Sequence, residues 1–381
     1  MTLSRRKTLA LLGGGCIVAA SGAAAFSVTR QPRTALAPWA AAGAYSEPRM
    51  RALSYAILAP NPHNRQPWQV DLQTEGEVTL RVDTNRLLPH TDPFSRQIVI
   101  GLGCFLELMT LAAAEDGFGV ELDLFPDGAD EAALDQRRVA VARLVPGGAR
   151  PDPLFAHTMD RRSLKEPFDI ARPVDQSALD TIAQSVARGS DADSSNDPDM
   201  VAALRLMTVR AFEIEFETPR TYKESVDLFR IGHREVDANP DGIDFSGPIF
   251  ETLRMTGLFS REAAMDREGM SYQQGLTQIT ETAMTGMAYV WLTTQTNTRA
   301  DQIKVGQDWL RLNLATTAVG LGMQPMSQAL QEFPEMTELY DEMHQMLAPA
   351  GGTVQMLGRL GYGAPVPRSP RWPLESKILD A

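Results

Sequence analysis

The chain has 381 residues, 43% of them hydrophobic, so it can bury a sizeable core as one large domain or two fused ones. Its net charge of −12 argues against nucleic acid as a partner, because phosphate backbones attract lysine and arginine. With two cysteines, Cys16 and Cys104, and five scattered histidines, the sequence contains neither a disulfide framework nor a metal-binding motif. No phosphate-binding glycine loop or serine-hydrolase motif follows a predicted strand either.

The chain begins with a segment typical of twin-arginine export. Arg5 and Arg6 precede an uncharged stretch, 8–29, in which 23–25 offer a small-residue cleavage site. An ordinary Sec signal with a chance arginine pair and an uncleaved anchor are the alternatives. The twin-arginine interpretation makes 1–25 a signal peptide. It predicts a periplasmic or otherwise extracytoplasmic protein that is exported folded, with no stable membrane insertion after cleavage. Folded export suits a protein that must acquire its cofactor in the cytoplasm.

The remaining chain reads as a mixture of helices and strands, typical of an α+β fold. The periodicity of apolar residues predicts helices over 48–58, 96–117, 175–188, 198–209, 276–298 and 302–320. It predicts strands over 68–73, 77–83, 119–125, 138–144, 211–217 and 353–361. Residues 190–199 read as a polar, acidic loop, and 220–275 are polar, rich in methionine and poorly periodic.

Two of the predicted helices share a pattern at a constant offset of 203 residues. Segments 103–119 and 306–322 match at Gly103/Gly306, Leu111/Leu314, Ala112/Ala315, Gly117/Gly320 and Gly119/Gly322. Coincidence between two buried helices is one explanation. Because each segment lies late in its half of the chain, we favour two fused copies of one domain. A connector rich in proline and glycine, 145–153, then separates copy 1 (46–150) from copy 2 (151–381).

Residues 59–68, APNPHNRQPW, join a predicted helix to a predicted strand. Asn61 and Asn64 favour turns, and Pro62 ends the helix. On composition alone a structural loop is the simplest interpretation, with His63 a hydrogen-bonded loop histidine rather than a ligand.

A second segment, 160–168, gathers three cations and a hydroxyl within five residues: Arg161, Arg162, Ser163 and Lys165. Arginine binds phosphate oxygens in pairs and serine adds a donor, so the segment suits a phosphate group. A solvated basic turn is the alternative.

Together the two segments resemble the flavin-dependent nitroreductase family. In that family an R-x-S-x-K/R segment holds the phosphate and ribityl chain of FMN, and an N-x-Q-P-W loop follows the next helix. They stand here at 161–165 and 64–68. A later G-L-G-x-x-P segment resembles 320–325, and the C-terminal G-Y and R-x-P resemble 361–362 and 371–373. The resemblance covers roughly residues 46–381.

The order of these motifs differs from that of one ordinary copy. In the family two subunits exchange elements, so each FMN site takes its R-x-S-x-K from one chain and part of its loop from the other. Copy 1 has no R-x-S-x-K around 38–47, and copy 2 has no N-x-Q-P-W around 209–218. The resemblance therefore implies a nitroreductase-like pseudo-dimer within one chain, able to exist as a monomer, with one complete flavin site. This pattern resembles the Acg-like branch, single-chain FMN binders in which a lid, here 220–275, covers the flavin.

The resemblance also implies a set of FMN-binding residues. Arg161, Lys165, Arg368 and Arg371 would surround the phosphate, with Ser163 on the ribityl side. The loop would present Asn61, Pro62, Asn64 and Gln66 to the ring, although Pro62 departs from the family pattern and lacks an N–H. Pro325, Met326, Ser327 and Gln328 would run past the N5 edge. No side chain is implied as a catalytic acid or base and no metal is implied, because the flavin supplies the redox chemistry.

The function implied is an FMN-dependent oxidoreductase that reduces a small acceptor, a nitroaromatic or quinone, through flavin N5 in a ping-pong cycle. The alternative is an FMN-binding or storage protein with little NAD(P)H turnover. A pseudo-dimer without any cofactor ranks third. Export bears on the choice, because NAD(P)H is not normally available outside the cytoplasm and an exported redox partner would have to replace it.

Overall fold

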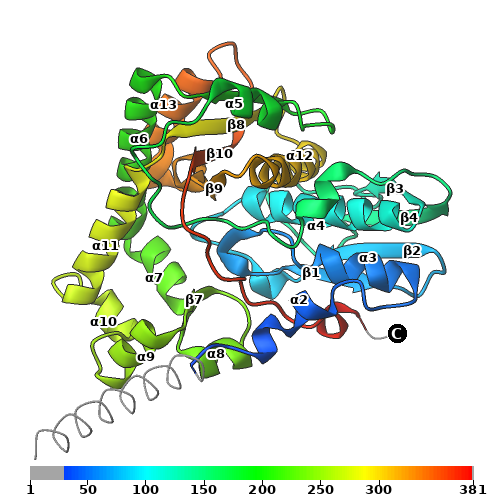
Figure 1. Ribbon diagram of the computed structural model, residues 1–381, viewed down its shortest axis with the longest axis horizontal. Coiled ribbons are helices and arrows are strands. Elements are labelled where there is room, and N and C mark those ends of the chain that lie inside the picture. The colour runs from blue at the N-terminus through cyan, green and yellow to red at the C-terminus, as the bar shows by residue number, and fades with distance from the viewer. Residues whose placement is uncertain (1–29, 380–381) are drawn as a thin grey trace, which may run out of the picture.

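The computed structural model describes residues 30–379, so the predicted signal peptide, 1–25, lies outside the described residues. Two four-stranded antiparallel sheets lie on either side of a pair of long helices, α4 (Arg96–Glu115) and α12 (Arg299–Ala318) (Figure 1). The helix pair carries the sequence repeat found at 103–119 and 306–322. By length and composition α4 is apolar enough to cross a membrane, but 94% of it is buried, as expected of a core helix.

The two sheets have the same strand order. The first contains β1 (Trp68–Asp71), β2 (Glu77–Val82), β3 (Phe118–Leu124) and β4 (Ala140–Pro146), in the order β1-β2-β4-β3. The second contains β5 (Asp191–Ser195), β8 (Ala288–Thr294), β9 (Gly322–Pro325) and β10 (Thr353–Gly361), in the order β5-β8-β10-β9. In both sheets a helix precedes the first strand, α3 (Pro48–Ala56) or α5 (Gln176–Ala183), and a long helix separates the second strand from the third. The α+β class and the duplicated architecture are therefore confirmed, while the boundary between the copies at 150–151 stays a prediction.

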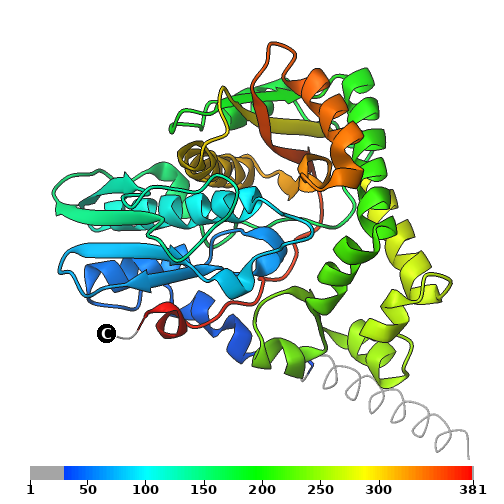
Figure 2. The same cartoon turned by 180° about the vertical axis from the view of Figure 1, so that it is seen from behind.

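Copy 2 differs from copy 1 by a helical insert between β5 and β8, which contains the predicted lid. The insert comprises α6 (Pro198–Glu217), α7 (Pro219–Asp227), β6 (Phe229–Ile231), α8 (His233–Ala238), β7 (Ile243–Phe245), α9 (Pro248–Met255), α10 (Arg261–Met265) and α11 (Met270–Ala283). It runs along one side of the molecule, from the second sheet to the short helix α2 (Ala37–Ala41) of the N-terminal region (Figures 1 and 2). Helix α13 (Thr337–Leu347) packs on the second sheet beside α6.

The C-terminal segment returns from copy 2 to copy 1. After β10 the chain crosses the molecule, and the Arg371 amide donates to the Ala35 carbonyl at 2.8 Å (Figure 2). Near the end of the described chain, the Leu379 amide donates to the Val70 carbonyl of β1 at 2.8 Å. Copy 1 is therefore completed by backbone from the C-terminal segment of copy 2.

Three local predictions are wrong. Residues 211–217 are not a strand, because α6 continues through them with Ala211, Phe212 and Glu215 buried at helical spacing. Residues 276–298 are not one helix, because β8 occupies 288–294. It is a central strand buried on both faces, and such an apolar run has no alternation to distinguish it from a helix. The polar segment 190–199 is not all loop, because it contains the edge strand β5.

Candidate functional site

The loop at 59–68 has an unusual backbone. His63, Asn64 and Gln66 all adopt positive φ angles, of 46°, 51° and 49°. Side chains other than glycine reach this region at a cost, and such residues persist where the surroundings hold them. One support is Gly101 on α4: a Cβ atom there would lie 3.1 Å from the Asn61 Cβ, so the small residue lets the loop approach the helix. The surrounding contacts thus fix the conformation of the loop.

The polar side chains of the loop tie together three parts of the chain. The Gln66 side chain accepts from the Trp372 amide at 2.9 Å and donates to the Pro240 carbonyl of the insert at 2.7 Å. The Asn64 amide donates to the Pro370 carbonyl at 3.0 Å. Asn61 accepts from the Gln66 amide at 2.7 Å. Because these side chains bind backbone, their predicted orientation toward a flavin ring stays a prediction, and the loop backbone is the better candidate for that contact.

Arg161 and Arg371 form the electrostatic centre of the site. Both guanidinium groups are buried, and both donate to the Leu58 carbonyl, at 3.1 Å and 3.0 Å. Arg371 also donates to the Asn64 Oδ1 at 2.8 Å. No carboxylate of the described residues makes an ion pair with either side chain.

Burial lowers the pKa of both guanidinium groups, but both remain charged at neutral pH. Desolvation lowers the pKa of Arg161 to about 10 and, with help from the charge of Arg161, that of Arg371 to about 9. Two cations therefore share one carbonyl in a buried place at neutral pH. Such an arrangement is costly without an anion to compensate it.

Trp39 lies beside three arginine side chains, one of which is Arg371. The guanidinium carbons of Arg162, Arg368 and Arg371 lie 5.0, 5.3 and 5.8 Å from the centre of its indole ring. The indole N–H donates to the Ser369 carbonyl at 2.8 Å, which fixes the C-terminal segment beside it. Trp39 was not identified from the sequence, because it precedes the recognisable motifs and a lone tryptophan carries no signal.

Ser163 and Lys165 lie beside the other predicted segment, 325–328. Ser163 forms an isolated parallel bridge with Met323 of β9, and the Leu164 amide donates to the Met323 carbonyl at 2.8 Å. Lys165 is solvent-accessible and makes no hydrogen bond or ion pair to any described residue, yet desolvation lowers its pKa.

The segment after β9 is held by its backbone. The Met326 amide donates to the Leu357 carbonyl at 2.7 Å, and the Ser327 carbonyl accepts from Gln97 of α4 at 3.2 Å. Pro325 is paired with Gly358 of β10. The Oε1 atom of Gln328 is buried without a hydrogen-bond partner.

His63 connects the loop to the insert. Its Nε2 atom lies 3.3 Å from the Ser225 Oγ of α7, and its Nδ1 atom is buried without a partner. Burial, followed by the charges of Lys165 and Arg65, lowers its pKa to about 4, so the ring is neutral at pH 7. The Lys165 ammonium is therefore near enough for its charge to act on the His63 ring.

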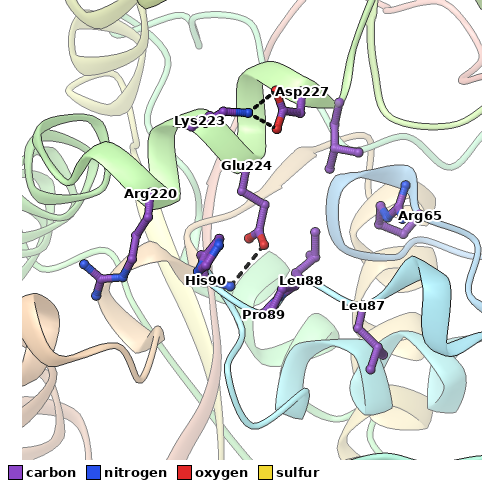
Figure 3. A pocket seen from close by; sticks show the side chains of 10 residues that line it. Arg65, Leu87, Leu88, Pro89, His90, Arg220, Lys223, Glu224 and Asp227 are labelled. Atoms are coloured by element: carbon purple, nitrogen blue, oxygen red, sulfur yellow. Dashed lines mark hydrogen bonds and ion pairs between the residues drawn. The ribbon is translucent and has the colours of Figure 1, made fainter.

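A cavity of about 400 Å³ opens on the other side of α7. Figure 3 shows it between that helix and residues 87–90, with Arg65 of the loop on its wall. Glu224 closes one end by accepting from the His90 and Thr91 amides at 3.0 and 2.9 Å. The insert is therefore docked on copy 1 next to the loop.

The equivalent place in the other half of the molecule is filled by the protein's own carboxylates. The loop between α5 and β5, 184–190, occupies the topological position of the loop at 59–68, so the earlier assignment of that position to 209–218 is wrong. Asp308 accepts from the Ala187, Arg188 and Ser190 amides at 2.7, 2.9 and 3.0 Å. The Ser185 carbonyl accepts from Arg311, as Leu58 accepts from Arg161.

Glu107 completes this filled place. It is fully buried and accepts from Arg188, Arg311 and Gln307 at 2.9, 3.0 and 3.1 Å. The two halves thus share a fold but differ in charge: one half pairs its cations with internal carboxylates, and the other leaves them without a counter-anion.

The residues at the unpaired half match the chemistry of FMN. A dianionic phosphate would compensate Arg161 and Arg371, and the Nε atom of Arg371 is buried without a hydrogen-bond partner. Two other residues of the predicted set or its loop also have a buried polar atom without a partner: His63, at Nδ1, and Gln328, at Oε1. Within residues 30–379 no group of three or more potential metal ligands comes together.

Known proteins similar to the chain carry nitroreductase names. "Putative NAD(P)H nitroreductase Rv3131" of Mycobacterium tuberculosis is 27% identical over 86% of this chain and 89% of its own length. "Putative NAD(P)H nitroreductase acg" of the same organism is 26% identical over 85% of this chain and 93% of its own length. No family model matches the chain.

Solved structures give a weaker likeness. A nitroreductase-like family protein from Bacillus cereus has a TM-score of 0.33 at 11% identity, over 60% of this chain and 96% of its own. A nitroreductase from Desulfovibrio desulfuricans, determined in complex with FMN, has a TM-score of 0.32 at 13% identity, over 61% of this chain and 98% of its own. The chain is thus similar, over most of its length, to mycobacterial proteins that are named as nitroreductases.

Proposed function

We propose that the protein is an FMN-dependent oxidoreductase of the nitroreductase type, with one flavin site per chain. The observation that carries the proposal is the convergence of Arg161 and Arg371 on the Leu58 carbonyl, both buried and neither paired with a carboxylate of the described residues. A buried pair of cations needs an anion, and the phosphate of FMN supplies one in a form that arginine binds well.

The remaining predicted residues take roles consistent with their places. Arg368, beside Trp39, and Lys165, in the segment 161–165, have no carboxylate partner among the described residues and add positive potential toward the phosphate. Ser163, next to β9, is placed to contact the ribityl chain, and 325–328 border the ring with Gln328 as a polar contact. Asn64 and Gln66 hold the loop, and Asn61 and Pro62 shape its turn.

When bound, FMN would transfer electrons from a donor to an acceptor, and the protein would supply orientation and electrostatics. We propose a small acceptor, a nitroaromatic or quinone, that enters after the donor has left in a ping-pong cycle. Buried cations near the cofactor favour its more negative reduced form and so ease its reduction.

A second function, FMN binding or storage without turnover, is favoured by the docking of the insert. Three sets of side-chain contacts hold α7 over the loop. Glu224 accepts from the His90 and Thr91 amides, Ser225 contacts His63, and Arg220 pairs with Glu335. If these contacts persist, the insert acts as a closed lid; if they open, the same segment admits an acceptor.

We also propose export by the twin-arginine route, which supports a donor other than NAD(P)H. The basis is the sequence of the leader, 1–25. Outside the cytoplasm, electrons would come from an exported redox partner, and the acceptor would be a small molecule.

The visible spectrum of the purified protein tests these proposals. An oxidised flavin spectrum supports the oxidoreductase if it bleaches when NADPH is added anaerobically, or if it bleaches with dithionite and returns when a soluble quinone is added. A spectrum that bleaches with dithionite but not with NADPH, and that a soluble quinone does not restore, supports the storage function. Protein purified and reconstituted with FMN that still shows no flavin absorbance would remove both.

A further inference from the structure

A line of hydrogen-bonding side chains crosses the boundary between the insert and the loop at 59–68. Glu215, on α6, receives the Ser225 hydroxyl at 3.4 Å, and Ser225, on α7, lies 3.3 Å from the His63 Nε2 atom. Glu215 and Ser225 are 5% and 8% exposed, so water does not freely replace these contacts. The far end of the line is the His63 Nδ1 atom, which is buried and lacks a partner.

Both ends of this line are fixed. The second carboxylate oxygen of Glu215 accepts from Gln331 at 3.0 Å, and Gln331 follows the segment 325–328 that borders the proposed flavin site. His63 adopts a positive φ angle of 46° in the loop whose conformation Asn64 and Gln66 hold.

We propose that Glu215, Ser225 and His63 form a proton relay that delivers a proton to the acceptor at the flavin site. This inference rests on the proposed function, since it needs a group that gains electrons beside His63. Glu215 and Ser225 act through His63 and are positioning residues, whereas the His63 Nδ1 atom would contact the reacting molecule.

The transfer is a simple shift along three groups. Protonated Glu215 gives its proton to the Ser225 Oγ, Ser225 gives its hydroxyl proton to the His63 Nε2, and His63 releases the proton on Nδ1 to an oxygen of the reduced nitroaromatic or quinone. One O–H bond breaks at Glu215 and one forms on the product, with no change of electron count in the relay. Afterwards Glu215 is a carboxylate and His63 is the other neutral tautomer.

The charges around Glu215 and His63 favour proton transfer from Glu215 toward His63. Burial raises the pKa of Glu215 to about 7, Gln331 and Ser225 lower it, and Glu224 raises it. The carboxyl is therefore part protonated at neutral pH, which is the condition for an effective proton donor. Lys165 and Arg65 face His63 and keep it neutral, so it passes a proton on instead of storing one.

Nitrogen-15 NMR of the histidine side chains tests the coupling without any turnover. The chain has only five histidines, so His63 is assigned by comparison with His63→Asn. We expect the His63 nitrogen shifts to show an inflection near pH 7 that reports the ionisation of Glu215. Glu215→Gln should remove the inflection, and Thr316→Val should keep it. Thr316 is the control, because its buried hydroxyl donates to the Leu312 carbonyl within α12 and touches no residue of the relay.

The rate at which a soluble quinone reoxidises the dithionite-reduced, flavin-loaded protein tests the relay itself. We expect the wild-type rate to fall as the pH rises through 7. Ser225→Ala should lower the rate below pH 7 by about tenfold or more and flatten the profile. Ser225→Thr should restore it, and Thr316→Val should leave it unchanged.

Two results would overturn the relay: an inflection of His63 that survives in Glu215→Gln, or a Ser225→Ala profile equal to that of the wild type. Failure to bind FMN is a separate result. It would remove the proposed function, while the NMR titration would still decide whether Glu215 and His63 are coupled.

Discussion

Gly103 of α4 and Gly306 of α12 lie against each other where the two helices cross. A Cβ atom on Gly103 would lie 2.8 Å from the Gly306 Cα and 2.1 Å from the Ile303 carbonyl oxygen. A Cβ atom on Gly306 would lie 2.8 Å from the Gly103 Cα and 1.9 Å from the Ile100 carbonyl oxygen. The contacts are reciprocal under the 203-residue offset, so a local two-fold axis passes between the two glycines.

Gly306→Ala should therefore destabilise the protein strongly. The added methyl group meets backbone, which cannot rotate away, so the helices must separate at the centre of the molecule. We expect a loss of about 3 kcal/mol in the free energy of unfolding, the upper end of the usual cost of overpacking, measured by chemical denaturation. Gly275→Ala is the control: Gly275 lies within α11 with nothing within 4 Å of a Cβ atom, and we expect a gain of about 0.5–1 kcal/mol. Equal effects of the two substitutions would contradict the close crossing.

That crossing also explains how much of the fold was predictable. The repeat was visible because glycines at a helix crossing cannot be replaced, and the motif order identified the duplication. By contrast, β8 is buried on both faces and its apolar run lacks the alternation of a half-buried strand, so it was taken for part of a helix. In 211–217 apolar and polar residues alternate by chance, and only the packing of α6 shows that these residues are helical.

The sequence motifs predict the cations of the candidate site, but they do not predict the residues that pack beside them or hold the loop. Arg161 and Arg371 were identified from motifs, and the structure brings them together on one carbonyl. Trp39, Ser225 and Glu215 were not identified, because their contacts join segments more than a hundred residues apart. Asn64 and Gln66 lie in the predicted loop but bind the C-terminal segment and the insert, a role that no local pattern encodes.

The purified protein should release FMN rather than FAD, at close to one flavin per chain. In the second half of the molecule, Glu107 and Asp308 already satisfy the arginines and amides of the equivalent place, so an anionic cofactor would have to displace buried ion pairs. Supernatant flavin after heat denaturation, divided by protein concentration, measures the ratio. A value near two would contradict the interpretation of Glu107 and Asp308.

Arg161→Ala should weaken FMN binding more than Arg162→Ala. Arg161 is buried and points at the Leu58 carbonyl beside Arg371, whereas Arg162 bonds the nearby Met159 and Arg161 carbonyls and lies over Trp39. Loss of one charge-assisted phosphate contact should cost about 1.5–3 kcal/mol, or roughly ten- to hundredfold in affinity. Fluorescence titration of the apoprotein with FMN measures both variants. Equal losses would place the phosphate elsewhere.

Glu215→Gln should change how stability depends on pH. Burial raises the pKa of Glu215 in the folded protein to about 7, from an ordinary value of 4.5, so its contribution to stability is fully present below pH 4.5 and is lost as the pH rises through 7. Glutamine carries no charge and avoids this loss, which amounts to up to about 3 kcal/mol. Denaturation of both proteins at pH 5 and pH 8 should show the variant gaining relative to the wild type at pH 8. Asp92, also buried with a raised pKa, is common to both proteins and cancels. A difference that is constant with pH would contradict a raised pKa.

The export proposal predicts where a charge-conserving leader variant accumulates. Arg5→Lys combined with Arg6→Lys keeps the positive charge before the uncharged stretch 8–29. A Sec signal needs only that charge, so it would tolerate the change, whereas the twin-arginine route reads the arginines themselves.

The flavin content of the protein also distinguishes the twin-arginine route from the Sec route. The proposed FMN contacts are non-covalent and come from segments as distant as Arg161 and Arg371, so an unfolded chain would not retain the flavin. We therefore expect fractionated cells to hold the double-lysine variant in the cytoplasm, folded and loaded with FMN. The unaltered protein should reach the extracytoplasmic fraction with its flavin. Normal secretion of the double-lysine variant would exclude the twin-arginine route, and with it the need to load the cofactor before export.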